Sequence, residues 1–224
     1  MRRLQFWILA SILMFFTACM QRERLQEGDL IFVGTPRDYS SERMGGAIAE
    51  ATGAGGPVNY IHVGIVRVRD GVVSVVDATP ERGVAVHSLH SFIEDALLPD
   101  GSLPVFTVRR LRDTSGAAGF VRNAERLAGL PYDETFLPEN EAYYCSELVW
   151  AAYVREDGTP VFRSAPMNFL APDGRLPRYW QELFDRLGMG VPQGVAGTNP
   201  QDMSDDPALK PVRIDIRSFY PSEK

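Results

Sequence analysis

A β-hairpin is the feature of this sequence that most limits how the chain can fold. Two runs rich in β-branched residues, YIHVGIVRV and VVSVVDA, are separated by only Asp70 and Gly71. An Asp-Gly pair between two such runs is a strong signal for a two-residue turn, because both turn positions need a positive φ. The chain is therefore expected to contain an antiparallel sheet with this hairpin in it.

The register of the hairpin places a histidine near a carboxylate. With a two-residue turn, Val66 pairs with Val75 and Gly64 pairs with Asp77. Residues two apart on a strand share a face, so His62 is a diagonal neighbour of Asp77. Such neighbours lie about 7–8 Å apart at Cα, within reach of an imidazole and a carboxylate. We expect Asp77 to orient His62 and stabilise its cation, the alternative being two ordinary strand residues.

The remaining segments predict helices and further strands around this hairpin. GDLIFVG, GVAVHSL and LPVFTVRRL are predicted strands, and apolar residues recur at helical spacing from Ala117 to Ala128. LPRYWQELFDRLG predicts a later helix, and the stretch from Gly190 to Leu209, rich in Gly, Pro, Asn and Asp, predicts a long loop. No break in composition divides the body, so residues 27–224 are expected to form one α+β domain with a loop-rich C-terminal part.

The first residues have the layout of a signal peptide. The basic MRR precedes an apolar run, LQFWILASILMFF, that is short for a membrane span and is followed by TAC. FTAC resembles the lipobox of bacterial lipoproteins, in which Cys19 is acylated and becomes the mature N-terminus. This predicts a signal peptide over residues 1–19, a tether over residues 20–26, and lipid anchoring in the cell envelope. Met20, rather than Asp, follows the cysteine, and the resemblance to enteric lipoproteins then implies the periplasmic face of the outer membrane. The alternative is a secretory signal cut near Ala18, or an uncleaved anchor.

The second cysteine, Cys145, stands at the predicted start of a helix. It lies in YYCSELVWAAY, where Leu148, Val149 and Ala152 follow at helical spacing. Free N–H groups and the positive end of the dipole at a helix N-terminus favour a thiolate and lower a cysteine pKa from about 8.5. The same N–H groups can bind the oxyanion that forms when an acyl carbon is attacked. Cys145 is a candidate nucleophile; the alternative is a small buried side chain that packs the helix start.

Other polar side chains are weaker candidates. His87 lies in a predicted strand without an obvious acidic partner and His90 precedes a helix, so both are expected at the surface or in loops. Glu147 suits the first turn of a helix for dipole reasons, Tyr144 is interpreted as packing, and Asp133 is given no catalytic role.

Three scattered histidines and one cysteine in the body give no metal-ligand spacing, so neither a metal nor another cofactor is expected. The net charge of -6 argues against nucleic-acid binding.

Five short blocks occur in the order found in a known family: GDLIF, HVGIV, VVDA, LPYD and YCSELVW. They resemble the circularly permuted papain-like proteins of the NlpC-type superfamily, the YiiX/YebB-like group, over residues 28–153. The resemblance implies a permuted papain-like fold, with an antiparallel sheet packed against helices and the nucleophile at a helix N-terminus. It further implies that Cys145 is the nucleophile and His62 the base, with Asp77 in a third polar position that is often occupied by Glu.

The resemblance also implies a thiol hydrolase that cleaves an amide bond through an acyl-enzyme, and we expect its substrate in the peptides of the cell wall. A lipid-directed thiol acyltransferase or lipase on the same scaffold stays open, as does a non-catalytic envelope lipoprotein that binds wall peptides. The expected partners are a peptide or amide substrate and, through the lipid on Cys19, a membrane.

Overall fold

A six-stranded antiparallel sheet forms the centre of the fold. The computed structural model describes residues 23–53 and 55–220. Within them the strand order is β4-β3-β2-β1-β5-β8, with every neighbouring pair antiparallel. The strands of this sheet are β1 (Leu30–Pro36), β2 (Val58–Arg69), β3 (Val72–Thr79), β4 (Gly83–Ser88), β5 (Val105–Leu111) and β8 (Leu209–Val212). This confirms the predicted antiparallel sheet and the α+β fold class.

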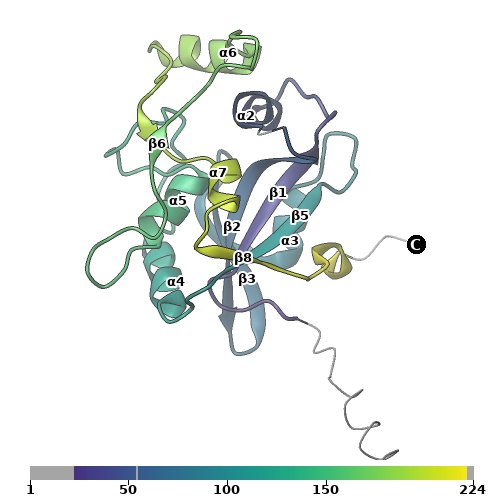
Figure 1. The fold of residues 1–224 in the computed structure, drawn as a ribbon, viewed down its shortest axis with the longest axis vertical. Helices are drawn as coiled ribbons and strands as arrows, with labels where there is room; N and C mark the ends of the chain where they lie inside the picture. Colours follow the sequence, from purple (N-terminus) through teal and green to yellow (C-terminus); the bar gives the residue numbers. More distant parts are fainter. Residues whose placement is uncertain (1–22, 54, 221–224) are drawn as a thin grey trace, which may run out of the picture.

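Helices cover both faces of this sheet (Figure 1). On one face α4 and α5 lie side by side against β2 and β3, and on the other α3 lies against β3 and β4. Two further helices, α2 and α6, contact each other at one end of the molecule. The helices are α2 (Met44–Thr52), α3 (Leu89–Asp95), α4 (Ala117–Arg126), α5 (Cys145–Ala152), α6 (Arg178–Leu187), α7 (Pro200–Ser204) and the 3-10 helix η1 (Ile216–Phe219).

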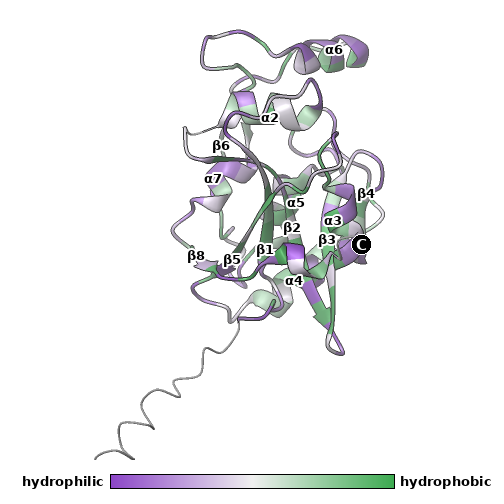
Figure 2. Ribbon diagram, turned by 90° about the vertical axis from the view of Figure 1, so that its right-hand side faces the viewer, coloured by the Kyte–Doolittle hydropathy of each residue, from purple (hydrophilic) through white to green (hydrophobic). Residues whose placement is uncertain are grey.

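Strand alternation divides the core between the two faces. In β1, Leu30 and Phe32 pack with α4 and α5, whereas Ile31 and Val33 pack with α3. All four side chains are at most 2% exposed, as expected for a strand in the middle of a covered sheet. Figure 2 shows these central strands largely in green, the colour of hydrophobic residues. The layered core therefore holds β2, which carries His62, rigidly against its neighbours.

The structure confirms the predicted hairpin. Arg69 pairs with Val72 across the turn, and the register continues to the pair Ile65 and Val76. Asp70 has φ 51° and Gly71 has φ 79°, both in the left-handed region that this turn requires. The two residues of the turn thus set which side chains share a face further along the strands.

The stretch from Gly190 to Leu209 departs from the prediction of a long loop. It contains β7 (Ala196–Gly197), which pairs with β6 (Ala165–Pro166), and the short helix α7. Contacts with distant residues order it: Gln201, 5% exposed, accepts a hydrogen bond from the backbone N–H of Tyr60 at 3.0 Å. The Gly, Pro and Asn content was misleading, because Asn199 caps α7 and Pro200 starts it.

The predicted signal peptide and Cys19 lie outside the described residues. Across residues 23–53 and 55–220, no helix has both the length and the apolar character that crossing a membrane would need.

Candidate active site

Cys145 is the first residue of α5, as the sequence predicted for this helix. Its side chain is 4% exposed, and no disulfide partner is present among the described residues. The N–H groups of Cys145 and Ser146 have no acceptor in the described part of the chain, whereas the N–H of Tyr144 is bonded to Glu147 at 3.4 Å. Two N–H groups of the helix start are therefore available to a negative oxygen beside the sulfur.

His62 faces Asp77, the neighbour that the hairpin register predicted. Its Nε2 atom lies 2.8 Å from Oδ2 of Asp77, and the two side chains are 21% and 4% exposed. Because Nε2 is engaged by the carboxylate, Nδ1 is the ring nitrogen left for Cys145. A bulge lies directly before His62: Val33 pairs with His62 but Gly34 pairs with Tyr60, so Ile61 is an extra residue in β2. Bulges next to active sites commonly redirect a side chain in this way.

The charges of the three side chains support one another. Burial disfavours a charged imidazole, but the negative charge of Cys145 and the hydrogen bond to Asp77 outweigh it and raise the pKa of His62 from 6.5 to about 10. Burial also disfavours the Asp77 carboxylate, yet its hydrogen bonds from His62 and His87 lower its pKa from 3.8 to about 2. At neutral pH His62 is therefore a cation hydrogen-bonded to the Asp77 carboxylate, and a cationic imidazole is the kind of neighbour that activates a thiol.

His87 is placed differently from the prediction. It is not a surface or loop residue without an acidic partner: it lies in β4, its side chain is 9% exposed, and its Nε2 atom is 2.7 Å from Oδ1 of Asp77. Asp77 pairs with Ala85 across β3 and β4, so His87 is its diagonal neighbour, just as His62 is on the other side. The same counting gives this contact once Thr79 is known to pair with Gly83, a pairing that the structure supplies. His90 is exposed, in line with the sequence, although it lies inside α3 rather than in a loop.

Glu147 and Asp133 form a second acidic feature near the helix start. Burial, with the charge of Asp133 as a further cause, raises the pKa of Glu147 to about 8. Asp133 is 1% exposed; its Oδ1 accepts hydrogen bonds from Thr135, while its Oδ2 has no partner among the described residues. Glu147 is therefore more than an acid favoured by the helix dipole, because its neutral form is the one that this environment stabilises.

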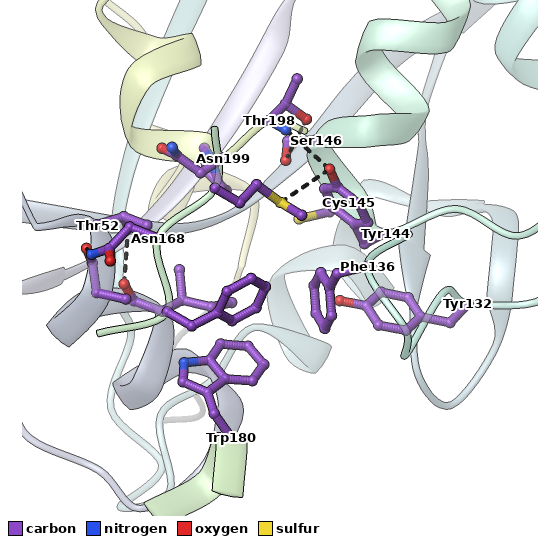
Figure 3. A pocket seen from close by; sticks show the side chains of 15 residues that line it. Thr52, Tyr132, Phe136, Tyr144, Cys145, Ser146, Asn168, Trp180, Thr198 and Asn199 are labelled. Atoms are coloured by element: carbon purple, nitrogen blue, oxygen red, sulfur yellow. Dashed lines mark hydrogen bonds between the residues drawn. The ribbon is translucent and has the colours of Figure 1, made fainter. Parts of the chain in front are cut away.

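Two cavities meet at Cys145. The larger, of about 220 Å³, is also lined by His62 and Asp77. The smaller, of about 50 Å³, adjoins it at Ile48, Tyr132 and Cys145 and is lined by neither His62 nor Asp77. Figure 3 shows the smaller cavity, in which the ring of Phe136 lies between those of Tyr144 and Trp180, at centroid distances of 5.1 Å and 5.3 Å. Several of its side chains come from the C-terminal third, whose part in the site the sequence did not reveal.

Comparison with known proteins identifies the family to which the chain belongs. Residues 24–213 match the family described as permuted papain-like amidase enzyme, YaeF/YiiX, C92 family. The uncharacterized protein YiiX of Escherichia coli K12 is 27% identical over 190 residues, which cover 84% of this chain and 85% of YiiX. A solved structure, described as the crystal structure of the metalloprotein yiiX from Escherichia coli O157:H7, is similar with a TM-score of 0.64 and 26% identity. That similarity covers 89% of this chain and 100% of the other.

These matches agree with the order of the sequence blocks, in which the histidine strand precedes the cysteine helix. The roles of Cys145, His62 and Asp77 stay predictions, now with a geometry that brings the three side chains to one site. The chain belongs to the family of permuted papain-like amidases, YaeF/YiiX, C92.

Proposed function

We propose that this protein is a thiol hydrolase that cleaves an amide bond, with Cys145 as nucleophile, His62 as acid and base, and Asp77 as the residue that orients His62. The observation that carries the proposal is the 2.8 Å contact between His62 Nε2 and Asp77 Oδ2 in a cavity that Cys145 also lines. A nucleophile at a helix start, an imidazole beside it and a carboxylate behind the imidazole are the parts that acyl transfer requires.

The first half of the reaction forms an acyl-enzyme. The thiolate of Cys145 adds to the carbonyl carbon, and the electron pair of the C=O bond moves to oxygen, where the N–H groups of Cys145 and Ser146 can stabilise it. The oxyanion then collapses, the C–N bond breaks, and His62 gives its proton to the departing nitrogen. The products of this half are a thioester on Cys145 and a free amine.

The second half regenerates the thiolate. Water enters beside neutral His62, loses a proton to it and adds to the thioester carbon. The C–S bond breaks, the sulfur leaves as thiolate and the acyl group leaves as a carboxylic acid. Asp77 stabilises the imidazolium in both halves without taking the proton, in keeping with its pKa of about 2.

The relative from Escherichia coli O157:H7 is described as a metalloprotein. No group of three or more His, Cys, Asp or Glu side chains within residues 23–53 and 55–220 is arranged to hold a metal ion. Around Cys145, both oxygens of Asp77 are already hydrogen-bonded to imidazole nitrogens at 2.8 Å and 2.7 Å. The described residues therefore do not fit a metal centre.

The substrate and the location are further parts of the proposal. We place the protein in the cell envelope, anchored by lipid on Cys19 at the periplasmic face of the outer membrane, with peptides of the cell wall as substrate. This rests on the FTAC segment and on the resemblance of the family blocks. Incorporation of labelled palmitate that is lost in a Cys19→Ser variant would support the anchor, and unchanged incorporation would contradict it.

Alkylation of Cys145 by iodoacetamide tests the activated thiol. We expect the wild-type protein at pH 7 to react much faster than a model thiol with a pKa of about 8.5, because the thiolate is the reactive form. The His62→Ala variant should react more slowly than wild type. A wild-type rate no greater than that of the model thiol, unchanged in His62→Ala, would count against catalysis.

The substrate class requires a separate measurement. Purified protein is incubated with cell-wall peptide fragments and, in parallel, with phospholipid vesicles, and the products are identified by mass spectrometry. New amine and carboxyl ends in the peptides, absent with Cys145→Ala, support the amidase proposal. Released fatty acid or acylated acceptor that depends on Cys145 supports the lipid-directed alternative instead.

A further inference from the structure

Both cavities beside Cys145 have largely apolar walls, but only the larger one also contains charged side chains. The larger contains His62 and Asp77 together with exposed charged residues such as Arg43 and Glu81. The smaller, which we name the aromatic pocket, is lined mainly by apolar side chains: Tyr132, Phe136, Tyr144, Met167, Phe169 and Trp180. Figure 3 shows several of these rings gathered on the side of the pocket away from Thr198 and Asn199.

The position of His62 decides which part of a substrate each cavity can hold. If His62 donates a proton to the departing nitrogen, that nitrogen must lie within hydrogen-bond reach of its ring, and therefore in the larger cavity. The acyl group is attached to the same carbonyl carbon but extends away from the nitrogen. It is then directed past Cys145 into the aromatic pocket, which Cys145 lines and His62 does not.

We infer that the aromatic pocket is the binding site for the acyl side of the substrate and that it selects an apolar group of amino-acid side-chain size. The inference rests on the proposed function, because it uses His62 as the proton donor. It adds the substrate class that the pocket accepts: a peptide with an aliphatic residue on the carbonyl side of the scissile bond.

The hydroxyl groups that line the pocket are already engaged within the protein. The hydroxyl of Tyr144 accepts a hydrogen bond from the N–H of Thr198 at 3.0 Å. The hydroxyl of Thr198 is bonded to that of Ser146 at 3.1 Å, and the hydroxyl of Thr52 donates to the carbonyl of Ile48 at 2.8 Å. Much of the hydrogen-bonding capacity of these hydroxyl groups is therefore used within the protein, and a substrate group would gain few hydrogen bonds from them.

The amide side chains are engaged as well. The Asn168 amide donates to the carbonyl oxygens of Ala51 and Leu170 at 2.9 Å and 2.7 Å, and Asn199 Oδ1 accepts the cap bond of α7 at 2.8 Å. Trp180 Nε1 is the exception, a donor without a partner among the described residues, but its atom is enclosed. A charged group that entered would lose its water and gain few hydrogen bonds in exchange, whereas an apolar group has no hydrogen bonds to water to lose.

The size of the pocket sets an upper limit on the group. Its volume of about 50 Å³ corresponds to room on the order of four water molecules. This suits a branched aliphatic side chain such as that of leucine. A long fatty acyl chain would extend beyond the apolar lining and gain nothing from its additional carbons.

The test compares acyl groups on one leaving group. Hydrolysis of the 4-nitrophenyl esters of N-acetylglycine, N-acetylleucine, N-acetylaspartate and dodecanoic acid is followed by the release of 4-nitrophenolate. We expect kcat/KM for the leucine ester to exceed that for the glycine ester by at least about tenfold, since one methylene in an apolar pocket is worth roughly that much. The aspartate ester should be poorer than the glycine ester. Equal rates for all amino-acid esters, or a dodecanoyl ester better than the leucine ester, would overturn the inference.

Two variants test whether the preference for the leucine ester arises in the aromatic pocket. Ala51→Leu fills the aromatic pocket from α2, at a half-buried position, and should bring the leucine-to-glycine ratio close to one. Thr79→Leu places a leucine in the larger cavity instead and should leave that ratio unchanged, because the acyl group lies elsewhere. If Thr79→Leu altered the leucine-to-glycine ratio and Ala51→Leu did not, the acyl group would lie in the larger cavity and the inference would be wrong.

A binding measurement separates this inference from the proposed function. If Cys145→Ala hydrolyses the esters as fast as wild type, or wild type hydrolyses none, the proposed function fails. Binding of the product-like acids N-acetylleucine and N-acetylaspartate to Cys145→Ala, followed by tryptophan fluorescence, then still tests the pocket. Tighter binding of N-acetylleucine, abolished by the added Ala51→Leu change, supports it; equal or weaker binding than N-acetylaspartate contradicts it.

Discussion

Asp77 accepts a hydrogen bond from Nε2 of His87 at 2.7 Å through the carboxylate oxygen that His62 does not use. The carboxylate is thus held from both sides, with one imidazole on each oxygen. A group held in this way cannot rotate to release His62. The nitrogen Nδ1 of His87 is in turn 3.8 Å from Asp95 and 3.4 Å from the guanidinium of Arg82, so the arrangement continues to the protein surface.

From this contact we predict that His87 positions Asp77 without touching the substrate. Replacing His87 with Ala removes a hydrogen bond to a charged group, which is worth about 1.5–3 kcal/mol, and should lower kcat/KM about 10- to 100-fold. His87→Gln, which keeps an N–H donor, should recover part of the loss. The exposed His90→Ala is the matched control.

The pH dependence distinguishes positioning from a structural role. If His87 acts through Asp77 and His62, His87→Ala should move the alkaline limb of the kcat/KM profile to lower pH. A loss of activity that follows only the loss of folded protein, with an unchanged profile, would contradict the prediction.

We predict that Asp77→Ala shifts the alkaline limb of the kcat/KM profile further than His87→Ala does. The alkaline limb reports the loss of the proton from His62, whose pKa is raised to about 10 in part by its hydrogen bond to Asp77. Asp77→Ala removes this support, so the limb should move toward neutral pH and alkylation of Cys145 at pH 8–9 should slow. The exposed Glu156→Gln changes charge equally and should leave the limb in place. An unshifted limb in Asp77→Ala would mean that Asp77 does not set the charge of His62.

The contact of His62 with Asp77 could be predicted from sequence because a two-residue turn leaves only one register. The contact of Asp77 with His87 depends on the connection between Thr79 and Gly83, which are themselves paired. That connection, TPERG, does not define its own length, although Gly83 has φ 64°, as expected at the end of a three-residue loop. The sequence therefore supports the contact of His62 with Asp77 more strongly than the contact of Asp77 with His87.

The aromatic pocket could not be predicted, for a different reason. Its walls are joined by contacts over long sequence separations, such as Thr198 with Ser146 and Asn168 with Ala51. Helical and strand periodicity report only which face of an element is buried, and not against which distant segment it packs. The segment from Gly190 to Leu209 has weak periodicity, and its order comes from these partners.

We predict that Gly64 is required for packing beneath the site. A Cβ at this position would lie 2.5 Å from Cγ1 of Val75 and 2.8 Å from Cε2 of Phe92. Phe92 is 1% exposed and its ring centroid is 5.9 Å from that of His62, so it cannot move without disturbing the histidine. Gly64→Ala should reduce the free energy of unfolding by about 1–3 kcal/mol, as overpacking does, and should lower activity.

Chemical denaturation measures this effect, with Gly119→Ala as the control. Gly119 lies inside α4, where a Cβ would meet only the end of the Arg122 side chain at 3.8 Å. Alanine is the better helix former, so this variant should be more stable by up to about 1 kcal/mol. If both variants shifted the denaturation midpoint in the same direction, the close contacts around Gly64 would not be the cause.

Glu147 leads to a prediction about stability and pH. Its pKa is raised to about 8 in the folded protein by burial and by the charge of Asp133, against 4.5 as the ordinary value. Between these two values the folded state holds a proton that the unfolded state has lost. Stability falls with pH wherever the folded state binds more protons, so Glu147 should lower the stability of the wild-type protein progressively from pH 4.5 to pH 8.

The Glu147→Gln variant isolates this contribution. Glutamine is neutral at every pH and its amide oxygen can still accept the hydrogen bond from the N–H of Tyr144. The variant should therefore be close to wild type in stability at pH 5 and more stable than wild type at pH 8, as measured by urea denaturation at both values. A variant that is less stable than wild type at pH 8 would show that the folded protein uses the charged form of Glu147. The negative charge at the start of α5 would then help to hold the helix that presents Cys145, as a simple helix-dipole argument proposes.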